Sequence, residues 1–190
     1  MARDMQQLDE SWRHMGELTI PFDPRQLSLY RCGDKAGIYD SVRFPLNKGK
    51  GKSKWGEFPL VVVREHYRSL GYIVLASDPR LPDGEGFILL SYSGYRKRRH
   101  PAYTQMAALL GTELAALDDL NRIADKAKIA ATGNRSGGDP DLFVYNPDGS
   151  ERFFVEAKYK DQLNSKQRVT FLIIRNLNWE VRVVRIVEQA

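Results

Sequence analysis

Three ionisable residues in the second half of this 190-residue chain have types and spacing that could act on a phosphate. Asp141 begins an alternating stretch, Asp141–Tyr145, of the kind that forms a β-strand. A turn with the sequence Asn-Pro-Asp-Gly follows, in which Pro restricts φ and Gly accepts a positive φ. In the next alternating stretch, Arg152–Lys158, a period of two places Glu156 and Lys158 on one face. The pattern predicts a hairpin that presents two carboxylates and one ammonium from neighbouring strands.

This combination is suited to binding a divalent cation. Two neighbouring carboxylates repel each other unless a hard cation lies between them, and Mg²⁺ is commonly held by one or two carboxylates, water and substrate phosphate. Such a cation polarises a phosphoryl oxygen and lowers the pKa of a bound water, which Lys158 could reach. The alternative is a solvent-facing strand on which Glu156 and Lys158 form an ion pair opposite Asp141, an arrangement that contributes little to stability.

The same residues carry a resemblance to a known family. Pro140-Asp141, followed fifteen residues later by Glu156-Ala157-Lys158, resembles the active-site motif of the PD-(D/E)XK nuclease superfamily. The stretch Gly-Asp-Pro-Asp-Leu-Phe-Val, Gln167 and a final Val-Arg-Val-Val-Arg-Ile strand are similar to the VRR-NUC family within it. Glu156 is the only one of the 24 acidic residues that has Lys at the second position after it.

The resemblance implies a Mg²⁺- or Mn²⁺-dependent endonuclease that hydrolyses DNA phosphodiester bonds. Free-standing members act on branched DNA as dimers, so a structure-specific enzyme (junction or flap) and a homodimer are implied too. Lys158 would position or deprotonate the attacking water, and Gln167 would face the metal site. The implied metal ligands are Glu57, Asp141, Glu156 and the carbonyl of Ala157.

Two of these residues also have purely structural explanations. Glu57 lies near the start of a predicted helix, Trp55–Leu70, where the helix dipole favours an acid. Gln167 has the capping-box spacing to Asn164, which predicts a helix that begins there.

Two other functions remain open. A nucleic-acid-binding module could keep this fold without cleaving, although the intact Asp141, Glu156 and Lys158 argue against it. A restriction-type or host-defence nuclease would share the active site and would show a preferred cutting sequence.

Basic residues outside the hairpin are candidates for contact with the phosphate backbone, since clustered cations give sequence-independent affinity for a polyanion. One cluster alternates with Gly and Ser, and its Gly-Lys-Ser fails the P-loop pattern because Leu46 stands where the first glycine belongs. A second cluster is flanked by tyrosines that could stack on unpaired bases. Either cluster could instead be a solvated loop. The candidates are Lys48, Lys50, Lys52, Lys54, Arg96, Lys97, Arg98, Arg99 and Arg135.

Composition restricts the class of protein. The chain is 42% hydrophobic, which indicates a folded globule, and its net charge of +5 is a modest basic excess. Its single cysteine, Cys32, excludes an intramolecular disulfide and favours a reducing compartment, and no apolar run approaches the length of a membrane span. We expect a cytoplasmic, DNA-associated protein without a membrane segment.

The predicted architecture is α/β, with a restriction-endonuclease-like core of helix, mixed β-sheet and helix. Residues 1–54 are expected to form an N-terminal extension, with short strands within Leu27–Phe44, and residues 55–190 the nuclease domain. A helical insertion at about 77–135, between the first and second core strands, contains a helix split at Gly111-Thr112. The remaining elements expected are strands at Tyr72–Leu75, Phe87–Tyr92 and Val181–Val187, and a helix from Asn164. The side chains of this helix expected to face the sheet are Val169, Leu172, Ile173 and Leu177.

Overall fold

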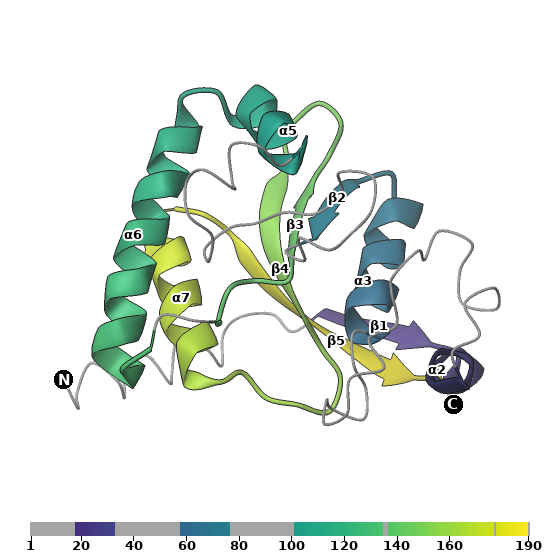
Figure 1. Cartoon of the computed structure of the whole chain (residues 1–190). Coiled ribbons are helices and arrows are strands. Elements are labelled where there is room, and N and C mark those ends of the chain that lie inside the picture. Colours follow the sequence, from purple (N-terminus) through teal and green to yellow (C-terminus); the bar gives the residue numbers. More distant parts are fainter. Residues whose placement is uncertain (1–17, 33–57, 77–100, 135–136, 177, 190) are drawn as a thin grey trace.

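A mixed five-stranded sheet is the centre of the computed structural model, which describes residues 18–32, 58–76, 101–134, 137–176 and 178–189 (Figure 1). The strand order is β1-β5-β4-β3-β2. β3 pairs antiparallel with β2 and β4, whereas β5 runs parallel to β4 and β1. The elements, in chain order, are β1 (Leu18–Phe22), α2 (Pro24–Cys32), α3 (Phe58–Ser69), β2 (Ile73–Ala76), α5 (Pro101–Leu110), α6 (Glu113–Thr132), β3 (Leu142–Tyr145), β4 (Arg152–Lys158), α7 (Ser165–Asn176) and β5 (Val181–Glu188).

Alternating side chains of the central strands bury both faces of the sheet. Leu142 and Val144 join one apolar cluster, and Phe143 and Tyr145 join the other. The first cluster packs against α3, and the second receives residues of α5, α6 and α7. Figure 1 accordingly shows α3 on one side of the sheet and α6 with α7 on the other. The described part of the chain is therefore an α/β fold with helices on both faces of the sheet.

Several sequence predictions are confirmed. The hairpin strands occur as expected, and β2 and β5 follow the predicted order. Two helices, α5 and α6, lie between β2 and β3, and the chain breaks between them at Gly111-Thr112. Thr112 occupies the cap position of α6, but its side chain makes no capping hydrogen bond.

The region before residue 55 differs from the prediction. Leu18–Phe22 is a strand of the same sheet, parallel to β5, and buries Ile20 and Phe22 in the core. Pro21 is compatible with this placement because β1 is the edge strand. The stretch up to Cys32 forms helix α2, so the described part of Leu27–Phe44, in which short strands were expected, is helical. Residues 18–32 thus belong to the α/β unit rather than to an extension outside it.

The apolar stripe of α7 was also assigned to the wrong positions. Phe171 and Ile174 are fully buried in the core, while Val169, Leu172 and Ile173 are only partly buried. A helix with apolar residues on most of its surface does not show in its sequence which stripe faces the sheet.

Some predictions fall on residues outside the described ranges: the strand Phe87–Tyr92, Glu57 and the two short strands expected around Gly33 and Gly37. Within the described ranges no helix has the length and apolar character needed to cross a bilayer.

Candidate active site

Asp141 and Glu156 come together because β3 and β4 are antiparallel neighbours. Leu142 pairs with Val155, so the residue before Leu142 lies opposite the residue after Val155. The carboxylate of Asp141 is held by the backbone of the opposite strand, since Ala157 N–H donates to its Oδ2 at 2.9 Å. The carboxyl groups of Asp141 and Glu156 therefore lie on the same side of the hairpin, as its sequence pattern predicted.

Glu156 is buried, with 1% of its surface exposed. Its Oε1 accepts hydrogen bonds from Lys158 Nζ, at 2.9 Å, and from Gln167 Nε2. No donor among the residues that the structure describes reaches its Oε2. A buried carboxylate oxygen without a donor is costly, and it has the chemistry of a ligand position for a cation.

The pKa values of Asp141 and Glu156 are both raised, and burial is the main cause. Removal of water by the surrounding chain raises the pKa of Asp141 from 3.8 to about 6, against the opposing effects of the Ala157 N–H and of Lys158. Burial, and then the charge of Asp141, raises the pKa of Glu156 well above its ordinary value. The charge of Asp141 therefore opposes ionisation of Glu156, whereas a hydrogen bond with Glu156 lowers the pKa of Asp141. A bound cation would favour the ionised form of both acids.

Lys158 neutralises part of this negative charge. Its ammonium is buried and lies 2.9 Å from Glu156 Oε1 and 2.9 Å from Asp161 Oδ2. Burial alone would lower the pKa of Lys158, but the charge of Glu156 and hydrogen bonds to Asp161 and Glu156 outweigh it and leave the pKa raised. Lys158 is therefore protonated at neutral pH.

Asp161 and Arg185 were not singled out from the sequence. Asp161 Oδ1 also accepts a hydrogen bond from Tyr159 N–H at 3.3 Å. Arg185 Nη1 donates to the carbonyls of Tyr159, at 2.7 Å, and Asp161, at 3.2 Å. The only sequence signal for Asp161 is its position three residues after Lys158, beyond the end of the strand. Arg185 pairs with Lys158 in the β4–β5 register, a long-range relation that periodicity cannot supply.

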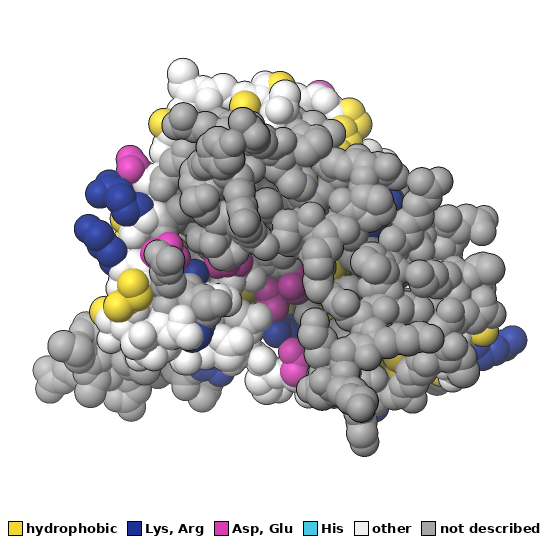
Figure 2. Space-filling view, viewed as in Figure 1, with side chains coloured by type: hydrophobic (Ala, Val, Ile, Leu, Met, Phe, Trp, Pro, Cys, Tyr) yellow, Lys and Arg dark blue, Asp and Glu magenta, His cyan; other side chains and the backbone are white. Residues whose placement is uncertain are grey.

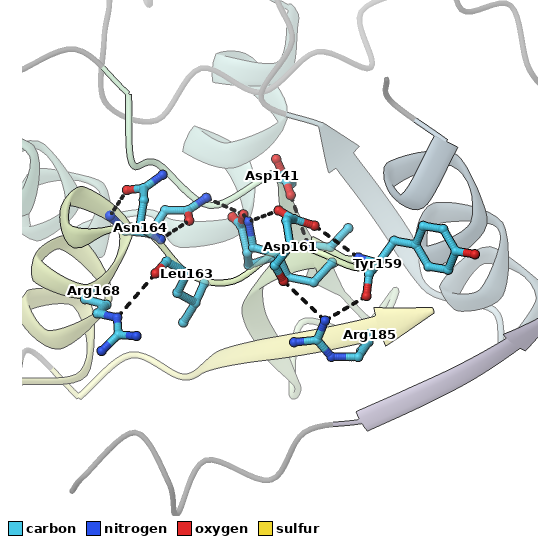
Figure 3. Close-up of polar contacts among 11 residues, drawn as sticks. Asp141, Tyr159, Asp161, Leu163, Asn164, Arg168 and Arg185 are labelled. Carbon is cyan, nitrogen blue, oxygen red and sulfur yellow. Dashed lines mark hydrogen bonds and ion pairs between the residues drawn. The ribbon is translucent and has the colours of Figure 1, made fainter. Parts of the chain in front are cut away.

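Gln167 forms the predicted capping box and also contacts Glu156, while its place at a metal site stays a prediction. Asn164 Oδ1 accepts from Gln167 N–H at 3.0 Å, and Gln167 Oε1 accepts from Asn164 N–H at 3.0 Å, so the predicted capping box is present. The amide nitrogen of Gln167 donates to Glu156. In Figure 3 the contacts extend from Asn164 at the start of α7, past the acidic side chains, to Arg185 on β5.

Two contacts hold the segment that leads into Asp141. Lys128 of α6 is completely buried, and its Nζ lies 3.0 Å from Asp139 Oδ1 and 3.3 Å from Gly137 O. On the other side, Gly138 has φ +88°, and a Cβ at that position would lie 2.7 Å from Cβ of Lys166 on α7. Helix α6 and the first turn of α7 thus fix the approach to β3.

Acidic side chains, with basic ones beside them, gather at the centre of the molecular face in Figure 2. The described residues contain no group of three or more His, Cys, Asp or Glu side chains that could hold a metal ion. Glu57, the third acidic ligand that was predicted, lies outside those residues, as do all nine basic residues predicted to contact nucleic acid. Ala157 contributes its N–H to Asp141, while its carbonyl as a ligand stays a prediction.

Comparison of the chain with protein-family models, curated proteins and solved structures finds no match. A function is therefore inferred from the residues of the site.

Proposed function

We propose that this protein is a Mg²⁺- or Mn²⁺-dependent endonuclease that hydrolyses DNA phosphodiester bonds. The observation that carries the proposal is the buried Oε2 of Glu156, which no donor in the described ranges reaches, together with the nearby carboxylate of Asp141. The order α3, β2, β3, β4, α7, β5 also supports a restriction-endonuclease-like core, interrupted by α5 and α6. The resemblance to VRR-NUC nucleases extends the proposal to branched DNA and a homodimer, and the single cysteine, Cys32, favours an intracellular location.

The donor set fits a divalent cation of the Mg²⁺ type. Such ions are commonly held by one or two carboxylates and complete their shell with water and substrate phosphate. Asp141 and Glu156 would hold the ion, with Glu57 and the Ala157 carbonyl as further proposed ligands. When bound, the cation supplies polarisation of a phosphoryl oxygen and a bound water of lowered pKa.

Of the two roles predicted for Lys158, positioning or deprotonating the attacking water, we propose only the first. Because its pKa is raised, its ammonium is charged at neutral pH and cannot accept a proton from water. We assign it to charge balance at the phosphorane and to positioning of a water or phosphate oxygen. Gln167 fixes the orientation of Glu156 by its hydrogen bond to Oε1, which leaves Oε2 for the cation.

One observation favours a second candidate, a nucleic-acid-binding module that does not cleave. Lys158 already bridges Glu156 and Asp161, so part of the negative charge is neutralised without a cation. In that case Glu156, Lys158 and Asp161 would stabilise the end of β4 without taking part in a reaction.

Cleavage assays separate the two functions. Plasmid DNA and a synthetic four-way junction are incubated with Mg²⁺, Mn²⁺ or EDTA, beside Asp141→Asn and Lys158→Ala. Asp119→Asn is the matched control, because it removes an exposed carboxylate that pairs with Arg122 on α6. We expect wild type and the control to cleave only with the cation, and the two site variants to lose at least about a hundredfold in rate. Cleavage that survives EDTA or either site substitution would contradict the mechanism, and binding without cleavage of any substrate would favour the second candidate.

A further inference from the structure

The ammonium of Lys158 lies between two carboxylates in very different environments. Glu156 Oε1 and Asp161 Oδ2 are each 2.9 Å from Nζ. The side chain of Glu156 is 2% exposed and that of Asp161 is 56% exposed. Only Glu156 belongs to the proposed cation site, so Asp161 is an anionic partner of Lys158 on the solvent side of that site.

The carboxylate of Asp161 is held in one orientation. Its Oδ1 accepts from Tyr159 N–H, which directs Oδ2 to Lys158. Arg185 Nη1 donates to the carbonyls of Tyr159 and Asp161 and so fixes the segment after β4 to β5 (Figure 3). Together, the Tyr159 N–H on the carboxylate and Arg185 on the backbone keep Asp161 Oδ2 within reach of the Lys158 ammonium.

We propose that Asp161 is a positioning residue that retains Lys158 at the site when a divalent cation binds Asp141 and Glu156. This inference rests on the proposed function. A divalent cation and an ammonium that share Glu156 repel each other strongly in a buried site. Asp161 offers the ammonium an anionic partner outside the proposed ligand set, so cation and ammonium can be accommodated together. Loss of Asp161 leaves Lys158 with Glu156 alone, where it competes with the cation.

The test measures Mn²⁺ binding to the purified full chain by isothermal titration calorimetry, without DNA. Asp161→Asn removes the charge but keeps an oxygen that can accept from Tyr159 N–H. We expect it to weaken Mn²⁺ binding at least about threefold, within the range of couplings between contacting charged residues. Asp119→Asn makes the same change of net charge on α6 and is expected to bind as wild type does. Unchanged affinity in Asp161→Asn would overturn the inference.

A second background tests whether Asp161 acts through Lys158. In Lys158→Met the competing ammonium is absent, and adding Asp161→Asn is expected to change Mn²⁺ affinity less than about 1.5-fold. An equal loss in both backgrounds would mean that Asp161 binds the cation itself or acts by net charge, and the positioning role would be wrong.

A spectroscopic measurement keeps the proposal open to refutation if Lys158→Met does not fold. In ¹H–¹⁵N spectra of the Mg²⁺-loaded protein, we expect a slowly exchanging ammonium signal from Lys158 in wild type and its loss in Asp161→Asn. A signal retained in Asp161→Asn would contradict the proposal.

Failure of the proposed function gives a different result. If wild type binds no Mn²⁺, or if Asp141→Asn and Glu156→Gln bind it as wild type does, the cation site itself is wrong and this inference falls with it. If those two variants lose binding while Asp161→Asn does not, the cation site stands and only the role of Asp161 is rejected.

Discussion

Gln167 donates a hydrogen bond from Nε2 to Glu156 Oε1, while the oxygen of the same amide accepts the bond that caps helix α7. One side chain therefore joins the start of a helix to the buried acid of the neighbouring strand. A glutamine can do both because its amide carries a donor and an acceptor on one rigid group. The orientation of Glu156 thus depends on where α7 begins.

Two substitutions separate these roles of Gln167. Asn164→Ala removes a capping bond, at a cost of about 0.5–2 kcal/mol. Gln167→Leu removes a capping bond and also the donor to Glu156, so we expect a further loss of about 1–3 kcal/mol in the free energy of unfolding. Urea denaturation in EDTA measures both. Equal losses in the two variants would mean that the contact with Glu156 contributes nothing.

Because Lys128 of α6 is buried and contacts Asp139, we expect the helical insertion to stabilise the segment that leads into Asp141. Lys128→Met leaves Asp139 without the ammonium that lies 3.0 Å from it, and it breaks a buried ion pair. We expect a loss of about 3–5 kcal/mol in the free energy of unfolding. Lys126→Met is the matched control, since Lys126 is exposed on the same helix and its loss should change stability by less than about 0.5 kcal/mol. Similar values for the two variants would show that Lys128 does not hold this segment.

Gly138 and Gly137 allow backbone strain to be separated from close packing. Both have positive φ, +88° and +78°, so an alanine at either position costs about 1–2 kcal/mol. Only at Gly138 does the added Cβ meet another segment, at 2.7 Å from Lys166 Cβ and 2.8 Å from its carbonyl carbon. We expect Gly138→Ala to lose about 1–3 kcal/mol more than Gly137→Ala, in the range of overpacking. Thermal unfolding of the two variants measures the difference, and equal losses would place the whole effect in backbone strain.

The hairpin and its acids could be predicted because their determinants are local. Asp141–Tyr145 and Arg152–Lys158 alternate with a clear period of two around a Pro-Gly turn, and this pattern fixes the register and the face of each side chain. The capping box at Asn164 was visible for the same reason, since its two members are three residues apart.

The residues that surround these acids were missed because their partners are distant in the chain. Arg185 reaches Asp161 only through the parallel pairing of β4 with β5. Ile20 and Phe22 alternate over five residues with a proline between them, so the sequence alone gave little reason to place β1 in the sheet. In the sequence, Lys128 is one of several charged residues on a helix. Its burial depends on contacts beyond that helix, including the one with the carbonyl of Gly137.

The raised pKa of Asp141 predicts how the stability of the metal-free protein depends on pH. An unfolded Asp141 loses its proton near 3.8, whereas the folded one keeps it until about 6. Between these values the folded Asp141 binds more protons, so the contribution of Asp141 to stability is greatest below about pH 4 and falls as the pH rises through about 6. The charge of Lys158 and a hydrogen bond with Glu156 oppose this rise in the pKa of Asp141, whereas the charge of Asp161 adds to it.

Asp141→Asn removes this dependence. In EDTA, we expect the variant to gain of the order of 1–3 kcal/mol relative to wild type between about pH 4 and about pH 8. Excess Mn²⁺ should reverse the trend, because the cation binds the ionised carboxylates and stabilises wild type as the pH rises, but not Asp141→Asn. Thermal unfolding across this pH range, with and without Mn²⁺, measures both trends. A difference between variant and wild type that stays constant with pH in EDTA would show that Asp141 titrates as an ordinary exposed acid, which would contradict the burial of its carboxylate at the proposed cation site.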